Sequence, residues 1–263
     1  MRDLSNEIIS QVNKDGFSYM QFKCLLDFGI KHAYSLKNED LYFSHSSIKS
    51  ARERENYRRL CDTIGVDVNN LVRPKQKHTD VIRRVDDVYN SDYLNDIDGL
   101  ITNKSNIVLA TTNADCILYL LYDKKKRVIG NIHSGWRGSY QRIIEKAIDK
   151  MISEYGSCPE DIIVCICPSI RRCCFEVDKD VRDIFYDKFS FLENIGNFVV
   201  NGYVSNKFFI DTVGINNCLL KNKGIKEENI YDCNICSVCN KDLIHSYRGD
   251  GKVFKLASAI ISL

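Results

Sequence analysis

The sequence predicts a protein in which strands and helices are mixed in irregular order. Three observations lead to this prediction. Short apolar runs of strand length cluster in the middle of the 263-residue chain, helical patterns lie around them, and no G-x-G-x-x-G or G-x-x-x-x-G-K-S/T motif occurs. The strict β-α-β alternation of a dinucleotide-binding fold is therefore not expected.

The N-terminal third carries weaker signals than the centre. Residues 17–26 and 33–36 are rich in aromatic and β-compatible residues and predict the two strands of an opening hairpin. Residues 46–64 place apolar side chains at helical intervals among charged ones, which predicts an exposed amphipathic helix. Residues 71–74 predict a short extended segment, and an alternating apolar pattern continues through Val85.

The centre and the C-terminal half predict a buried sheet with helices packed against it. Near-continuous apolar runs indicate strands that are covered on both faces. The expected strands are residues 107–112, 116–122, 128–132, 162–166 and 256–263. The expected helices are residues 139–155, 178–189 and 210–222. Gly156 is suited to a left-handed cap at the end of the first of these helices.

Composition limits the function classes. The formal net charge is only +2, so no electrostatic field favours nucleic acid or an anionic membrane. The chain has neither a signal-peptide-like start nor an uninterrupted run of about 18 apolar residues, and we expect a cytoplasmic protein. The 12 cysteines are then expected to be thiols, metal ligands or small buried groups rather than disulfides. No linker-like stretch or repeat divides the chain, which favours one domain.

Three potential metal ligands lie where predicted strands meet turns. They are His78, Cys116 and His133. Two imidazoles and a thiolate suit Zn²⁺, and three protein ligands leave a fourth position for water or substrate, as in catalytic zinc sites. The three residues are far apart in sequence, and a histidine at a strand end is often a purely structural residue. The spacing alone therefore does not decide between a zinc site and structural roles.

Several segments follow one another in the order of a known family. They are Asp98-Gly99-Leu100-Ile101-Thr102, Ala114-Asp115-Cys116, His133-Ser134-Gly135-Trp136-Arg137-Gly138, Cys167-Pro168-Ser169-Ile170 with Cys174-Phe175-Glu176-Val177, and Ser246-Tyr247-Arg248. From about Leu71 to the C-terminus the sequence resembles the YfiH-like family. Its members were long labelled multicopper polyphenol oxidoreductases or laccases, and were later recognised as purine nucleoside phosphorylases with adenosine deaminase activity. The segment 133–138 is highly specific among these motifs.

The resemblance implies an α+β fold in which mixed β-sheets are covered by helices, similar to the cytotoxic necrotizing factors. It implies a single catalytic domain over residues 1–263, with the strands and helix of residues 1–70 integrated into it. It also implies that His78, Cys116 and His133 form a zinc site. Copper is the alternative metal, because Cu²⁺ generally outcompetes Zn²⁺ for nitrogen and sulfur ligands.

The implied activity is zinc-dependent phosphorolysis of adenosine, inosine and S-methyl-5'-thioadenosine, together with deamination of adenosine. The implied partners are thus purine nucleosides and phosphate, not nucleic acid or a membrane. Zinc lowers the pKa of bound water from 15.7 to roughly 7, so hydroxide is available near neutral pH to attack C6 of the purine. We expect Cys116, His133 and Asp115 to be the catalytic residues.

The residues around the triad each have two expected roles. Arg137 precedes a predicted helix and is expected to contact phosphate or a nucleoside hydroxyl, or else to pair with Asp115 or Glu176. Trp136 is expected to stack on the purine, or else to pack in the core or at its rim. Asp115 is expected to orient a ligand imidazole, or else to cap a turn.

Arg248 is the preferred phosphate ligand. The chain departs from the family pattern nearby, since Gly249 and Lys255 stand where the family usually has arginines. Lysine does not replace the two-pronged hydrogen bonding of arginine. Arg248 is therefore expected to carry an unusually large share of phosphate binding, unless it pairs with a buried carboxylate.

Two other function classes stay open. A metal-free cysteine hydrolase would use Cys116 as nucleophile with His133 as base. A non-enzymatic partner protein would carry a vestigial site. Copper-dependent polyphenol oxidation, the older label of the family, is disfavoured because the sequence lacks the paired H-x-H segments of multinuclear copper oxidases.

A second cysteine cluster has no assigned role. The spacing Cys233-x-x-Cys236-x-x-Cys239 could begin a metal or iron–sulfur site. A fourth ligand has no obvious source in the neighbouring sequence. The distant candidates are Cys165, Cys167, Cys173 and Cys174.

Overall fold

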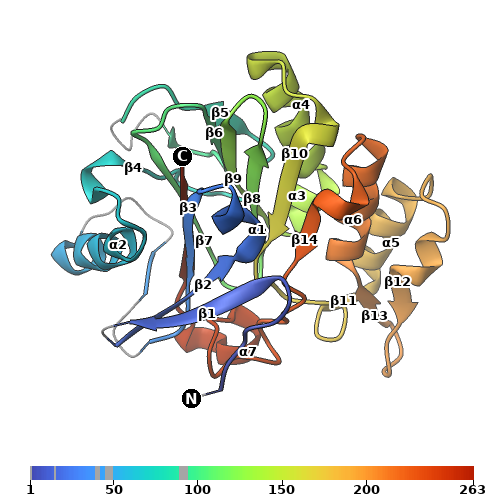
Figure 1. Cartoon of the computed structure of the whole chain (residues 1–263). Helices are drawn as coiled ribbons and strands as arrows, with labels where there is room; N and C mark the ends of the chain where they lie inside the picture. The colour runs from blue at the N-terminus through green and yellow to red at the C-terminus, as the bar shows by residue number, and fades with distance from the viewer. Residues whose placement is uncertain (1, 15, 39–41, 45–49, 89–93) are drawn as a thin grey trace.

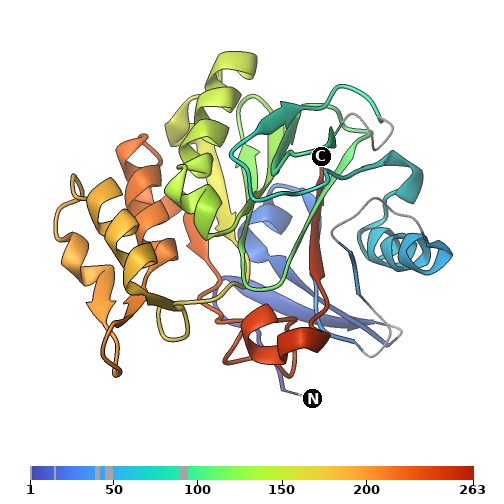
Figure 2. The same ribbon diagram turned by 180° about the vertical axis from the view of Figure 1, so that it is seen from behind.

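Two mixed β-sheets that pack face to face form the centre of the computed structural model, which describes residues 2–14, 16–38, 42–44, 50–88 and 94–263 (Figures 1 and 2). Within these residues the first sheet has six strands, in the order β1 (Ile9–Lys14), β2 (Phe17–Phe22), β3 (Lys31–Ser35), β15 (Ala257–Ser262), β7 (Val108–Asn113) and β4 (Leu71–Val72). The second also has six described strands, in the order β14 (Ile230–Asp232), β10 (Ile162–Ile166), β8 (Ile117–Asp123), β9 (Val128–Ser134), β6 (Gly99–Thr102) and β5 (Ile82–Arg84). Each sheet is antiparallel except for its outermost parallel pairs, β4–β7 in the first and β5–β6 and β10–β14 in the second.

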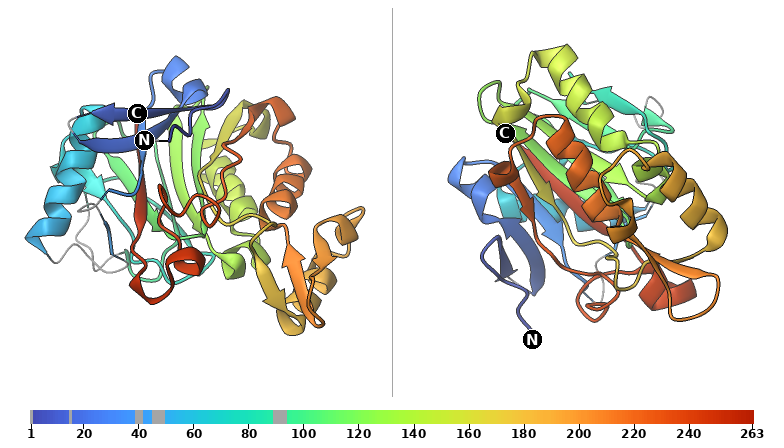
Figure 3. Two further views of the ribbon diagram at one scale, coloured as in Figure 1. Left: turned by 90° about the horizontal axis from the view of Figure 1, so that it is seen from below. Right: turned by 90° about the vertical axis from the view of Figure 1, so that its right-hand side faces the viewer.

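A third, smaller sheet lies at one end of the molecule together with α5 (Figure 3). Its described strands are β11 (Glu176–Asp178), β13 (Lys207–Ile210) and β12 (Val199–Asn201). The α-helices are α1 (Lys23–Asp27), α2 (Ala51–Ile64), α3 (Trp136–Tyr140), α4 (Ile143–Tyr155), α5 (Lys179–Lys188), α6 (Thr212–Asn222) and α7 (Tyr247–Asp250). Short 3₁₀ turns occupy Val68–Asn70, Pro159–Asp161, Ile195–Asn197, Glu227–Asn229 and Gly251–Val253.

Helices cover the outer faces of the two large sheets. Alternate side chains of β3 and β15 point to opposite faces, so one set packs between the sheets and the other packs under α2. The outer face of the second sheet packs against α4 and α6, whose apolar stripes include Ile148 and Leu219. The layers therefore run helix, sheet, sheet, helix, and the predicted α+β fold with helix-covered mixed sheets is confirmed.

The buried central strands agree with the sequence prediction. All residues of β7, β8, β9 and β10 are buried, as near-continuous apolar runs require, and their bounds lie within one or two residues of the predicted ones. The charged turn between β8 and β9 is closed by Asp123, whose carboxylate accepts hydrogen bonds from two backbone amides of the turn. Gly156 has φ 67° and caps α4 in the predicted left-handed conformation.

Two predicted elements are wrong in part. The strand predicted for residues 17–26 ends at Phe22, whose amide donates to the imidazole of His32 at 2.7 Å, and the next residues form α1. The helix predicted for residues 139–155 is two helices, because Arg142 adopts φ 61° and a right-handed helix cannot pass through that conformation.

Two further predictions need a shift of bounds. The helix predicted for residues 46–64 begins at Ala51, after the cap of Ser50, and residues 46–49 lie outside the described residues. The helix predicted for residues 210–222 begins at Thr212, because Asp211 caps it by accepting the amide of Gly214 at 2.8 Å. No helix in the described part of the chain has the length and apolarity that a membrane crossing requires.

Candidate active site

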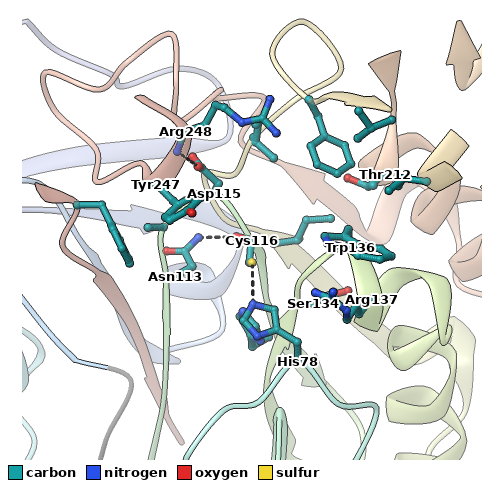
Figure 4. A pocket seen from close by; sticks show the side chains of 18 of the residues that line it. His78, Asn113, Asp115, Cys116, Ser134, Trp136, Arg137, Thr212, Tyr247 and Arg248 are labelled. Atoms are coloured by element: carbon teal, nitrogen blue, oxygen red, sulfur yellow. Dashed lines mark hydrogen bonds between the residues drawn. The ribbon is translucent and has the colours of Figure 1, made fainter. Parts of the chain in front are cut away.

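Two loops and the end of a buried strand bring His78, Cys116 and His133 together. His78 lies in the loop that follows β4, Cys116 directly precedes β8, and His133 lies near the end of β9. Because β8 and β9 are adjacent antiparallel strands, the start of one lies beside the end of the other. The two imidazoles and the thiol place ligand atoms within 4.8 Å of one another (Figure 4).

The spacing of the triad fits one tetrahedral zinc ion. The Cys116 sulfur lies 3.7 Å from Nε2 of His78. Zinc bonds of about 2.3 Å to sulfur and about 2.0 Å to nitrogen would separate those atoms by about 3.6 Å at the tetrahedral angle. The separation of Cys116 and His78 therefore fits two ligands of one ion, and His133 places its ligand atom within 4.8 Å of both.

Gly135 is needed for this close approach. It follows β9, and its backbone passes beside the first two ligands. A Cβ atom at this position would lie 2.4 Å from Cδ2 of His78 and 3.2 Å from the Cys116 sulfur. Only glycine leaves room for both ligands.

Asp98 orients the ligand loop and one imidazole. This fully buried carboxylate lies 2.7 Å from Nδ1 of His133, so Nε2 of that ring is directed to the site. It also accepts hydrogen bonds from the amides of His78 (3.0 Å) and Thr79 (2.7 Å). Burial raises the pKa of Asp98, but His133 and Thr79 lower it further, to about 2.

The thiol and the imidazole favour a charged pair when no metal is bound. Burial raises the pKa of Cys116, but the charge and hydrogen bond of His133 and the contact with His78 lower it to about 6. Burial lowers the pKa of His133, but Cys116 and Asp98 raise it to about 9. The site thus stabilises a thiolate, which is the form that binds metals.

The triad lies in the wall of a cavity of about 520 Å³ (Figure 4). This volume is within the range of small-molecule sites. Besides the triad, its lining includes the remaining predicted site residues: Asp115, Trp136, Arg137 and Arg248. The structure therefore brings every residue proposed from the sequence to one cavity.

Trp136 and Arg137 form one side of the cavity. Trp136 is half-buried and packs on the core near Phe185, with ring centroids 6.4 Å apart. The guanidinium of Arg137 lies 4.3 Å from the centroid of the Trp136 ring. Among the described residues no carboxylate pairs with Arg137, so the expected alternative of an ion pair with Asp115 or Glu176 is not found.

Asp115 takes the second of its two expected roles. Its carboxylate accepts hydrogen bonds of 2.6 Å from the hydroxyls of Ser237 and Ser246 and from the amide of Arg248. It therefore anchors the start of α7, and Asp98 is the carboxylate that orients an imidazole. None of the three hydrogen bonds that the Asp115 carboxylate accepts comes from a ligand imidazole, and its orienting role stays a prediction.

Arg248 lies on the opposite side of the cavity from Arg137, as Figure 4 shows. Its side chain donates through Nη1 to the backbone carbonyls of Cys174 (3.2 Å) and Glu176 (3.1 Å). In the described part of the chain no carboxylate pairs with this guanidinium. Arg248 also lines the cavity.

Sequence reasoning missed several residues of the site. Asp98 and Gly135 belong to the quoted motifs, yet their roles became visible only from the geometry. The cavity lining also includes Phe175 and Tyr247, which belong to the quoted motifs but were given no role, and Thr212, for which no pattern gave a signal. Of the cysteine cluster, Cys233 stands apart with its buried thiol 3.8 Å from Nη2 of Arg171, whereas Cys236 and Cys239 lie beside Cys173 and Cys174.

Comparisons with known proteins relate the chain to one family. Residues 44–262 match the family model described as multi-copper polyphenol oxidoreductase laccase. The chain is 34% identical to a purine nucleoside phosphorylase of Clostridium acetobutylicum, over 90% of this chain and 92% of the relative. It is 30% identical to the human purine nucleoside phosphorylase LACC1, over 89% of this chain but only 53% of that protein. It is also 30% identical to an adenosine deaminase of an unknown prokaryotic organism, over 72% of this chain and 73% of the relative.

A solved structure supports the fold. The YfiH protein of Bacillus licheniformis superposes with a TM-score of 0.83 at 25% identity, over 95% of this chain and all of that one. The resemblance to the YfiH-like family is thus confirmed.

Proposed function

Because the chain belongs to the multi-copper polyphenol oxidoreductase laccase family, we propose that it is a zinc-dependent purine nucleoside phosphorylase that also deaminates adenosine. The names of its relatives support a purine nucleoside as substrate. The substrates proposed are adenosine, inosine and S-methyl-5'-thioadenosine, with phosphate as co-substrate. The cytoplasmic location and the single domain over residues 1–263 stay predictions, the latter supported by β15 lying between β3 and β7.

One observation carries the proposal. A Cys-His-His set with tetrahedral spacing lies in the wall of a cavity that is large enough for a nucleoside. The donor set is borderline-soft, as zinc prefers. Zinc bound by these three residues would supply Lewis acidity, which activates water for deamination and polarises a phosphate or leaving-group oxygen for phosphorolysis.

The chain's own residues would divide the remaining tasks. Asp98 accepts the proton of Nδ1 of His133 in a hydrogen bond, which leaves the unprotonated Nε2 facing the site. Arg137 and Arg248 offer guanidinium groups on two sides of the cavity, where a phosphate would be held by paired hydrogen bonds. Trp136, Phe175 and Tyr247 offer aromatic surface for a purine. Catalysis is proposed for Cys116 and His133, and Asp115 would act only by anchoring the Arg248 segment.

A metal-free cysteine hydrolase is the second candidate, and the electrostatics of Cys116 and His133 also suit it. The lowered pKa of Cys116 and the raised pKa of His133 describe the thiolate–imidazolium pair that such enzymes use. Metal analysis of protein purified without added zinc separates the two candidates. Zinc bound by Cys116 excludes a free thiolate nucleophile, and copper in its place would instead favour the oxidase label of the family.

A nucleoside panel tests the proposal. Adenosine, inosine and S-methyl-5'-thioadenosine are incubated with the enzyme, with and without phosphate, and the products are separated by chromatography. Free base and sugar phosphate should form only with phosphate, and inosine should form from adenosine without it. An enzyme with stoichiometric zinc that turns over no nucleoside under either condition would refute the proposal.

A further inference from the structure

Four cysteines from two distant segments meet outside the cavity. Cys173 and Cys174 lie in the turn between β10 and β11, and Cys236 and Cys239 lie in the loop that follows β14 (Figure 1). Their sulfur atoms all lie within 4.8 Å of one another. The sulfur of Cys239 is 3.5 Å from that of Cys174 and 3.8 Å from that of Cys173.

These separations are those of ligands around one metal ion. With zinc–sulfur bonds of about 2.3 Å, the edges of a tetrahedral four-thiolate site are about 3.8 Å long. An iron–sulfur cluster holds its cysteine sulfurs further apart, since several iron and sulfide atoms lie between them. The geometry therefore fits a single ion rather than a cluster.

The surroundings also suit a metal-bound thiolate. The backbone amides of Cys239 and Arg171 donate hydrogen bonds to the sulfur of Cys236. Such amide contacts stabilise sulfur that carries negative charge. Cys173 and Cys239 are exposed, so an ion can enter from solvent.

We propose that Cys173, Cys174, Cys236 and Cys239 bind a second metal ion, one tetrahedral Zn²⁺ with a structural role. Four protein ligands close the coordination sphere, which distinguishes this site from the open Cys-His-His site. Binding involves no change in oxidation state. Each thiol that coordinates the ion forms a metal–sulfur bond and releases its proton to solvent.

The ion would join two segments that build the wall of the cavity. The carbonyl of Cys174 accepts a hydrogen bond from Arg248, and Phe175 and Glu176 next to it line the cavity. The loop that carries Cys236 and Cys239 also contains Ser237, which donates to Asp115. Loss of the ion should therefore loosen the Arg248 side of the cavity while leaving the first metal site in place.

Metal stoichiometry tests the proposal. We expect two zinc ions per chain in wild-type protein purified anaerobically without chelators. Cys173→Ser and Cys239→Ser should each lose one of the two and melt at a lower temperature, and Cys116→Ala should lose the other. The matched control is Cys158→Ser, because Cys158 is also exposed but lies outside both sites, and it should keep two.

Cobalt substitution provides a second measurement that does not depend on the stability of the serine variants. Wild-type and Cys116→Ala protein loaded with Co²⁺ should both show the intense absorption of a tetrahedral four-thiolate centre. A single zinc per wild-type chain that is lost in Cys116→Ala, iron in place of zinc, or a native disulfide among the four cysteines would each overturn the proposal.

Discussion

At the scale of single residues, position 135 is the one at which the site requires a particular amino acid, glycine. Its missing side chain is what allows His78 and Cys116 to approach, since a Cβ atom would lie 2.4 Å from the imidazole. We expect Gly135→Ala to displace His78 and to weaken metal binding at the triad by tenfold or more. The matched control is Gly138→Ala, because a Cβ atom at that position has no neighbour nearer than 3.4 Å. Equal zinc affinity in both variants, measured by competition with a chromogenic chelator, would contradict this account.

The triad itself is tested by removing its ligands one at a time. Cys116→Ala, His78→Ala and His133→Ala should each bind one metal ion fewer than wild type while keeping a folded circular dichroism spectrum. Asp98→Asn leaves all three ligands but removes the charge that orients His133. Its zinc affinity should fall by about 10–100-fold, the usual cost of changing a residue that supports a ligand. Retention of the full metal content in two of the three alanine variants would show that the assignment is wrong.

Arg248 should separate the two proposed activities, since only phosphorolysis needs a site for an anion. A guanidinium–phosphate hydrogen bond contributes about 1.5–3 kcal/mol. Arg248→Ala should therefore lower phosphorolysis by about ten- to a hundredfold, mainly through a higher apparent KM for phosphate. Deamination of adenosine should change much less. The backbone amide of residue 248 would still donate to Asp115, so the loop should stay in place.

Two controls accompany this substitution. Arg248→Lys keeps the charge but not the planar fork, and should recover only part of the phosphate affinity. The side chain of Arg248 also holds two carbonyls, so the melting temperature is measured beside both rates. An equal fall in both rates together with a lower melting temperature would mean that the residue is structural.

Sequence reasoning proposed the three ligands of the candidate metal site, which the structure brings together, but not Asp98, which supports His133. The residue types at three positions match those of the family, and such a match can be recognised without knowledge of the geometry. Asp115 was expected to orient a ligand imidazole, and the role of Asp98 could not be found in the same way. Asp115 has φ 82°, a conformation that turns its carboxylate toward the start of α7. Nothing in the local sequence reveals that turn.

At the scale of elements, His32 fixes the corner between β2, α1 and β3. Nε2 accepts the amide of Phe22 at 2.7 Å, and Nδ1 lies 2.9 Å from the carbonyl of Ile30. The ring is fully buried and must be neutral to accept the first hydrogen bond. Burial lowers its pKa to about 4, despite the opposing effect of the Ile30 carbonyl. The strand β2 therefore ends at Phe22, whose amide donates to the side chain of His32.

This geometry predicts acid-sensitive stability. Between the ordinary histidine pKa of about 6.5 and the folded value near 4, the unfolded chain binds a proton that the folded chain does not. Neutral His32 should therefore make its full contribution to the free energy of unfolding above pH 6.5. That contribution should be lost as the pH is lowered toward 4. The loss from this residue should be on the order of 3 kcal/mol.

Comparison with His32→Gln isolates that contribution. Glutamine can accept and donate hydrogen bonds but does not titrate in this range. Urea unfolding of metal-free wild type and variant is measured at several pH values from 4 to 7.5. The variant should have the shallower dependence, and parallel curves for the two proteins would disprove the role of His32.

The elements that were predicted correctly differ physically from those that were missed. Every residue of β8 and β9 is buried, so the apolar run itself marks the strand. In β1 only Ile9 is buried, because this strand lies at the edge of its sheet, and its sequence ISQVNK shows little apolar alternation. The strands of the third sheet have only three or four residues, too few to establish a period.

At the scale of the whole molecule, the pairing of strands that are distant in the sequence could not be predicted from local sequence patterns. The C-terminal strand β15 lies between β3 and β7, so strands from both ends of the chain and from its middle share one sheet. Buried Asn131 of β9 then links the two sheets by donating to the carbonyls of Leu109 and Ala259. Hydrophobic periodicity predicts strands but not partners, and the family resemblance implied only that mixed sheets are covered by helices.

The distribution of cysteines over the whole molecule leads to a last prediction. All twelve are free thiols in the structure, although the sulfur of Cys24 lies only 3.6 Å from that of Cys165 and the sulfur of Cys174 lies 3.5 Å from that of Cys239. Burial raises the pKa of Cys165 and Cys167, which keeps these thiols protonated and slow to oxidise. Titration of anaerobic protein in denaturant and chelator, without added reductant, should therefore find twelve reactive thiols. In native protein, addition of chelator should expose thiols that bound metal had protected, whereas a disulfide would stay unreactive under both conditions. A reproducible deficit of two thiols in the unfolded, metal-free protein would contradict this prediction.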